Sequence, residues 1–130
     1  MSNPKITETI ELSLPVNAAY VSTARLTASS IANRQGFDVD ETEDIKAAVS
    51  EACTYIIRKS HGCGSLFHLV FHIGDGHVEI ALSSVQANGG ADDEEMSILM
   101  IKALMDGLTI TNDGGSLSIR MQKTHQVMDL

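Results

Sequence analysis

The sequence lacks any long run of apolar residues. None of its 130 residues belongs to a stretch approaching the roughly 20 apolar residues that a membrane-spanning helix needs. Residues 1–5 also lack the apolar core of a secretory signal peptide. Hydrophobic residues nevertheless make up 43% of the chain, which is ordinary for a globular protein. We therefore expect one cytoplasmic domain over residues 1–130, with a buried core and no membrane segment.

Positive charge is also scarce. Nine lysines and arginines against 17 aspartates and glutamates give a formal net charge of −8 at pH 7. Proteins that bind nucleic acid usually present a basic surface, because contacts to phosphate dominate their affinity. The same charge balance disfavours an anionic membrane surface. We expect neither kind of contact, and a protein partner or self-association remains open.

Cysteine is limited to two residues, Cys53 and Cys63, which form neither a disulfide framework nor a zinc motif. Cys53 falls within an apolar helical run, where a buried thiol acts as a small hydrophobic side chain. Cys63 lies between two glycines in an expected loop. Neither cysteine is assigned a function.

Hydrophobic periodicity predicts a strand and then a helix at the start of the chain. Apolar and polar residues alternate over 8–14, which is typical of a half-buried strand. Asn17 is expected to cap a helix that runs to about Gln35, before Gly36. The apolar stripe of this helix is expected to include Val21, Ala24, Leu26, Ala28 and Ile31.

The remaining patterns predict two more helices and four strands. Asp40-Glu41-Thr42-Glu43 has the spacing of a capping box and predicts a second helix to about Lys59, with Gly62 as its terminator. A third helix is expected over 96–105, after a polar loop. Strands are expected over 66–73, 77–83, 108–111 and 117–121, with hairpin signals at 74–76 and 112–115. The order β-α-α-β-β-α-β-β predicts an α+β two-layer sandwich: a mixed, mostly antiparallel sheet with three helices on one face.

Three strings, in order and spread over nearly the whole chain, belong to the three expected helices: YVSTARLTAS (20–29), DIKAAVSEACT (44–54) and IKALMD (101–106). They resemble the helices of the bacterial anti-sigma-factor serine kinases, the RsbW-like proteins. The resemblance implies the histidine-kinase-type ATPase fold and a homodimer. It also implies binding of Mg-ATP, phosphorylation of a serine on an anti-anti-sigma protein, and sequestration of a sigma factor.

The second helix of that family carries a glutamate and, four residues later, an asparagine, which share one helix face. Glu51 matches the glutamate that is the general base of the family, and here it is expected to be a vestige that lines a wet pocket. Tyr55 stands at the position of the asparagine that coordinates magnesium, and a neutral phenol is a poor ligand for a hard cation. Tyr55 is expected to fill the space of the ligand, with Glu51 as the hydrogen-bond partner of its hydroxyl.

Two further motifs of the family are altered. Ser84 occupies the position of the aspartate that reads adenine, and Gly89 and Gly90 follow too late for the adjoining glycines. The two glycines that open the last helix and approach the phosphates fall on Glu95 and Ser97. A carboxylate about 4 Å from a phosphate charge costs on the order of 4 kcal/mol at an effective dielectric constant of about 20. The segment 85–94 is also short for the mobile lid of the family, so no cofactor is expected.

Arg25 matches the first-helix arginine through which members of the family contact protein partners. His68, His72 and His77 are expected to share the outer face of a hairpin. Such a group suits a transition metal or, more simply, a polar sheet face.

The sequence thus predicts a non-catalytic regulatory protein of the anti-sigma type. It would bind a sigma factor or an anti-anti-sigma factor in a transcriptional switch of the stress or sporulation kind. The alternatives are an active serine kinase that uses Glu51, and a sensor of a metal or small molecule.

Overall fold

The computed structural model describes residues 5–60, 66–85 and 95–126, and the structural statements below concern these residues. In chain order the elements are β1 (Glu8–Pro15), the 3₁₀ helix η1 (Ala18–Tyr20), α1 (Val21–Arg34), α2 (Val39–Ser60), β2 (Leu66–Gly74), β3 (His77–Val85), α3 (Met96–Leu104), β4 (Gly107–Asp113) and β5 (Ser116–Thr124). The predicted order of helices and strands is confirmed. None of the helices in these ranges is long and apolar enough to cross a bilayer.

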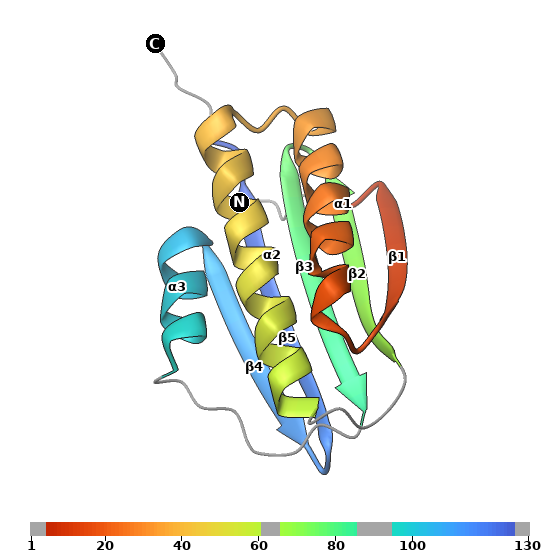
Figure 1. Cartoon of the computed structure of the whole chain (residues 1–130). Helices are drawn as coiled ribbons and strands as arrows, with labels where there is room; N and C mark the ends of the chain where they lie inside the picture. Colours follow the sequence, from red (N-terminus) through yellow and green to blue (C-terminus); the bar gives the residue numbers. More distant parts are fainter. Residues whose placement is uncertain (1–4, 61–65, 86–94, 127–130) are drawn as a thin grey trace.

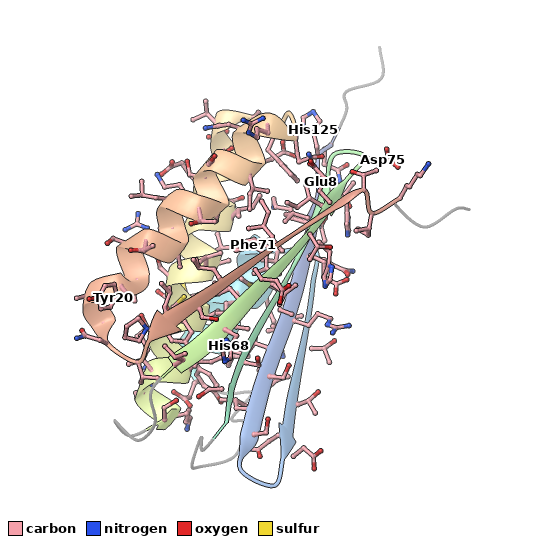
Figure 2. All side chains as sticks on the ribbon, turned by 90° about the vertical axis from the view of Figure 1, so that its right-hand side faces the viewer. Glu8, Tyr20, His68, Phe71, Asp75 and His125 are labelled. Atoms are coloured by element: carbon pink, nitrogen blue, oxygen red, sulfur yellow. The ribbon has the colours of Figure 1, made fainter. Side chains whose placement is uncertain are left out.

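The strands form one five-stranded sheet in the order β1-β2-β3-β5-β4. Every pair of neighbouring strands is antiparallel, so the sheet is fully antiparallel and not, as predicted, mixed. The three helices lie against one face of the sheet, with α2 between α1 and α3 (Figure 1). In the perpendicular view, no described helix covers the other face (Figure 2). The α+β two-layer architecture predicted from the sequence is confirmed.

Two short turns close the hairpins. Between β2 and β3, Asp75 and Gly76 have φ values of 53° and 67°. Between β4 and β5, Gly114 and Gly115 have φ values of 58° and 95°. Two consecutive residues of positive φ match the twist of the flanking strands, and aspartate and glycine tolerate this conformation. Both hairpins predicted from the sequence are confirmed.

The core lies between the sheet and the helices. Alternate residues of the central strands face the helices, as the pleat requires. The largest fully buried side chains come from α2, α3 and the strands β2, β3 and β5: Ile45, Tyr55, Ile56, Phe67, Leu69, Phe71, Ile80, Leu82, Ile98, Ile101, Leu117 and Ile119. Helix α2 contributes buried residues over its whole length, from Glu41 to Ser60, and it lies between α1 and α3 (Figure 1).

Helix α1 differs from its prediction in two respects. Asn17 does accept a hydrogen bond, from Ala19 N at 2.9 Å, but it caps η1, and α1 begins only at Val21. Leu26 was expected on the core stripe and is 70% exposed. The core face of α1 carries Ala24 and Ala28. Leu26 lies two residues from each of them, and because successive helix residues are rotated by about 100°, it points to the opposite side.

The capping box of α2 lies two residues earlier than predicted. Asp38 N donates to Glu41 Oε1 at 2.9 Å, and Glu41 N donates to Asp38 Oδ1 at 2.8 Å. Glu43, the predicted member of the box, pairs instead with Lys46 at 3.0 Å. The reason is tertiary: Phe37 is buried in the core, so the chain turns into the helix directly after it.

Several predictions concern residues outside the described ranges. These are the helix terminator Gly62, the loop cysteine Cys63, and the segment 86–94 with its glycines and the proposed short lid. They remain predictions from the sequence.

Candidate functional site between α2 and α3

The last two turns of α2 bring an aromatic ring and two cations together. Tyr55 is fully buried. The guanidinium carbon of Arg58 lies 5.6 Å from the centroid of the Tyr55 ring, and Lys59 Nζ lies 5.5 Å from it. Residues three and four positions apart share a helix face, which explains this grouping. The phenol ring therefore has two positive charges within cation–π distance.

A carboxylate from α3 contacts both cations. Glu95, the residue before α3, forms an ion pair between its Oε1 and Arg58 Nη2. Its other oxygen, Oε2, lies 2.9 Å from Lys59 Nζ. Burial raises the pKa of the Glu95 carboxyl, but the contacts with Lys59 and Arg58 lower it by a larger amount, so this pKa lies below its ordinary value. The contact with Glu95 in turn raises the pKa of Lys59. The carboxyl of Glu95 and the ammonium group of Lys59 are therefore charged at neutral pH.

Ser84 lies in the interior at the end of β3. It is 1% exposed, and its Oγ lies 3.1 Å from Oγ of Ser60, the last residue of α2. Ser60 Oγ donates to the carbonyl of Ile56 at 2.7 Å. Ser97, in the first turn of α3, is also buried. Ser84 and Ser97 are thus both buried, Ser84 beside the end of α2 and Ser97 at the start of α3.

Glu51 lies one turn before Tyr55 on α2 and is half-buried. No hydrogen bond or ion pair of Glu51 occurs in the described part of the chain. A hydrogen bond from the Tyr55 hydroxyl to Glu51 is thus not found among the described contacts, and this pairing stays a prediction. Among the described residues, Arg58 and Lys59 are charged groups at the tyrosine ring. The sequence reasoning missed them although they follow Tyr55 at helical spacing.

Arg25 lies apart from this site, on the exposed side of α1. A shallow hollow there is lined by Ser22, Arg25, Leu26 and Lys46, so it spans α1 and α2. Lys46 pairs with Glu43, whereas Arg25 forms no ion pair with any described residue. The exposed Leu26 beside it gives the hollow an apolar component.

The three histidines do not gather around a common point. His68 Nδ1 lies 2.8 Å from Ser13 Oγ, and His72 Nδ1 lies 3.5 Å from Thr9 Oγ1. His77 is buried, with its Nδ1 2.7 Å from the hydroxyl of Thr124. No group of three side chains able to hold a metal ion occurs in the described ranges. Each histidine ring thus has a hydroxyl neighbour on an adjacent strand.

Comparison with known protein families matches residues 14–123 to the histidine kinase-like ATPase domain. The chain belongs to this family. Within it, the chain resembles the serine-protein kinases RsbW, so the resemblance read from the three helix strings is confirmed.

Two RsbW relatives illustrate the similarity. Serine-protein kinase RsbW of Bacillus mycoides is 31% identical, in an alignment that covers 89% of this chain and 84% of the relative. Serine-protein kinase RsbW of Halalkalibacterium halodurans is 42% identical over 76 residues, which cover 58% of this chain and 47% of the relative. The second match thus spans less than half of the relative.

A solved structure supports the fold of the histidine kinase-like ATPase domain. The RsbU and RsbW domains of Rv1364c from Mycobacterium tuberculosis match with a TM-score of 0.74 and 17% identity. The match covers 91% of this chain and 32% of that one. At this identity the likeness concerns the fold. Membership of this ATPase family and similarity to the RsbW kinases imply nucleotide use.

Proposed function

We propose that the chain is a non-catalytic regulator of the anti-sigma type. It binds a sigma factor or an anti-anti-sigma factor in the cytoplasm, in a transcriptional switch of the stress or sporulation kind, as a single domain. Membership of the RsbW-like family supports the class of partner. The observation that carries the non-catalytic part is the pairing of Glu95 with Arg58 and Lys59, since it places a charged carboxylate at the start of α3.

The residues at this site do not fit magnesium and a triphosphate. Magnesium requires several small oxygen ligands in octahedral geometry. The α2 position that holds asparagine in the family here holds the buried phenol of Tyr55. The carboxylate of Glu95 is already engaged by two cations, and its charge repels phosphate at the helix start. The site is therefore not suited to phosphoryl transfer.

The partner surface in this proposal is the hollow on α1. Arg25 offers a guanidinium with no intramolecular ion pair among the described residues, and Leu26 is 70% exposed beside it. An uncompensated arginine next to an exposed apolar side chain is the combination that protein interfaces favour. A partner with a carboxylate next to an apolar residue would match it.

The experiment measures both parts separately. Thermal unfolding with and without Mg-ATP tests the site, because a ligand that binds only the native state raises the melting temperature. We expect no rise, and a rise of several degrees would refute the non-catalytic reading. Titration calorimetry against candidate sigma and anti-anti-sigma factors tests the partner. Arg25→Ala should weaken binding at least about tenfold, whereas Arg34→Ala, on the same helix, should not.

One observation favours a second function, an active serine kinase. Glu51 is half-buried on α2 and has no hydrogen-bond partner among the described residues, so its carboxylate is available as a general base. Transfer of labelled phosphate to an anti-anti-sigma domain, abolished by Glu51→Gln, would establish this function. Absence of ATP binding would exclude it.

The family resemblance also leads us to propose a homodimer. Light scattering coupled to gel filtration measures the mass directly, and 13.9 kDa is the mass of one chain. A mass of one chain at micromolar concentration would refute this part without affecting the others.

A further inference from the structure

The α2–α3 contact has an unusual charge balance. Arg58 and Lys59 are adjacent cations, and the Glu95 carboxylate is the single acid that pairs with them in the described ranges. Among the residues that the structure describes, two positive charges thus share one negative charge at this contact. The formal net charge of the whole chain is −8. The side-chain exposures of Arg58, Lys59 and Glu95 are 47%, 20% and 20%, so the group is partly accessible to solvent.

Glu95 is held near the two cations by its covalent attachment to α3. It is the residue immediately before α3, and α3 is anchored in the core through Ile98 and Ile101. A carboxylate held in this way acts at a high effective concentration, so a free anion has to compete with it at a disadvantage.

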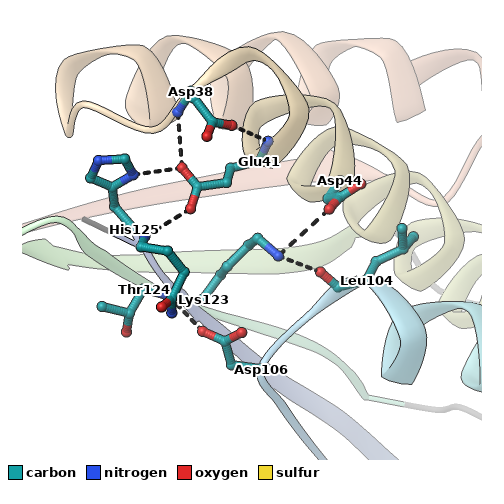
Figure 3. A network of polar contacts seen from close by, with 9 residues as sticks. Asp38, Glu41, Asp44, Leu104, Asp106, Lys123, Thr124 and His125 are labelled. Carbon is teal, nitrogen blue, oxygen red and sulfur yellow. Dashed lines mark hydrogen bonds and ion pairs between the residues drawn. The ribbon is translucent and has the colours of Figure 1, made fainter. Parts of the chain in front are cut away.

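The other end of α3 is fastened as well. Lys123 Nζ donates to the Leu104 carbonyl at 2.7 Å and lies 3.7 Å from Asp44 Oδ2 of α2. Asp106, just after α3, accepts a hydrogen bond from Thr124 N at 2.8 Å (Figure 3). Loss of the Glu95 contact therefore leaves α3 attached through its buried residues Ile98 and Ile101 and through Lys123.

We propose that Glu95 is a tethered counter-ion which occupies a latent anion site made by Arg58 and Lys59 and so excludes free anions of the polyphosphate class. A guanidinium and an ammonium side by side present several donors and two positive charges, which suits an anion with many oxygens better than a single carboxylate. The inference rests on the proposed function, because it describes how the same site is kept closed.

The alternative is that the three residues are only a structural brace. The two readings predict opposite results when the carboxylate is removed. If the contact is only structural, the variant protein loses stability and gains no binding. If Glu95 is a tethered counter-ion, its removal uncovers a binding site for anions. The gain of binding is therefore the decisive observation.

The test is calorimetric titration of the whole chain with sodium tripolyphosphate, without divalent metal, at low ionic strength. The variants are Glu95→Gln and Glu95→Ser, the second because serine is a favoured residue at a helix N-cap and keeps α3 well started. Glu43→Gln is the matched control, since it removes one exposed acid of α2 that also pairs with a lysine. Circular dichroism verifies that each variant is folded.

We expect either Glu95 variant to bind tripolyphosphate at least about tenfold more tightly than the wild type and Glu43→Gln. Adding Arg58→Ala to the Glu95 variant should abolish the gain. Equal affinity of the folded Glu95→Ser variant and the wild type would overturn the proposal, as would a gain that survives Arg58→Ala. The wild-type melting temperature with Mg-ATP decides the proposed function independently of these results.

Discussion

Glu41 Oε1 lies 2.6 Å from His125 Nδ1, so the first turn of α2 is joined to the residue that follows β5. The same carboxylate accepts hydrogen bonds from Asp38 N and from Gln126 N, both at 2.9 Å (Figure 3). Phe37 packs edge-on against the His125 ring, with the ring centroids 6.0 Å apart. One buried carboxylate thus serves both as the helix cap and as the anchor of the chain after the sheet.

Glu41→Gln is expected to reduce the free energy of unfolding by about 1.5–3 kcal/mol at pH 7, because hydrogen bonds to a buried charge are lost. Burial raises the pKa of Glu41, but the hydrogen bonds from Gln126, Asp38 and His125 bring it below the ordinary value. A carboxyl with a lowered pKa stabilises the fold above its unfolded-state pKa, and this contribution disappears as the pH falls through the folded-state value. Urea unfolding at several pH values measures it.

The difference between wild type and Glu41→Gln should therefore shrink as the pH falls below about 4. Glu43→Gln provides the control, since its carboxylate is exposed and should change stability by about 0.5 kcal/mol or less. A pH-independent difference for Glu41→Gln would show that the charge of the carboxylate has no part in the cap.

Tyr55→Asn restores the residue type of the family and should still fail to restore Mg-ATP binding, because Glu95 remains paired. Removal of the fully buried ring should cost about 3 kcal/mol or more. Tyr20→Asn is the control, because Tyr20 is 41% exposed and a surface change usually stays within about 0.5 kcal/mol. Chemical denaturation and thermal shift with Mg-ATP measure the two effects. Binding by Tyr55→Asn alone would mean that the phenol, not the carboxylate, closes the site.

The order of the helices and strands could be predicted because each element shows the hydrophobic periodicity of its type and turn residues separate neighbouring elements. The details that failed depend on tertiary contacts. Both 38–41 and 40–43 have capping-box spacing, and burial of Phe37 decides between them. Strand β5 extends to Thr124 because its backbone continues to pair with β3, although the apolar alternation ends earlier.

The candidate site was predictable in part for a similar reason. Glu51 lies within a matched string, and Tyr55 and Ser84 were found by their positions relative to the motifs of the family. The pairing of Glu95 with Arg58 joins residues 37 positions apart, and it depends on the end of α2 meeting the start of α3. No local pattern carries that information. The positions of Arg58 and Lys59, three and four residues after Tyr55, can be recognised in the sequence, but their shared pairing with Glu95 cannot.

Gly74→Ala is expected to destabilise the protein by about 1–3 kcal/mol. A Cβ atom at Gly74 would lie 2.0 Å from the Lys5 carbonyl oxygen and 2.9 Å from Thr7 N, so the segment before β1 would have to move. That movement would break the hydrogen bond from Thr7 N to the Ile73 carbonyl, now 2.8 Å long. Urea unfolding measures the loss.

Gly107→Ala is the matched control for that substitution. The three atoms nearest to its Cβ would all belong to the flexible side chain of Gln122, the nearest at 3.0 Å. Alanine is also favoured over glycine within a strand by roughly 0.5–1 kcal/mol, so we expect no loss. Equal destabilisation by both substitutions would contradict the close approach of the first segment to Gly74.

Cys53 should be unreactive in the folded protein. Burial raises the pKa of its thiol to about 12, so at pH 8 roughly one thiol in ten thousand is ionised, and reagents attack the thiolate. In a Cys63→Ser background, so that the signal comes from Cys53 alone, labelling with a disulfide reagent should proceed only as fast as the protein opens, and should accelerate with urea. Leu26→Cys in the same background places a thiol at a 70% exposed position and should label at once. Rapid stoichiometric labelling of Cys53 without denaturant would mean that the α2 core opens far more readily than its packing implies.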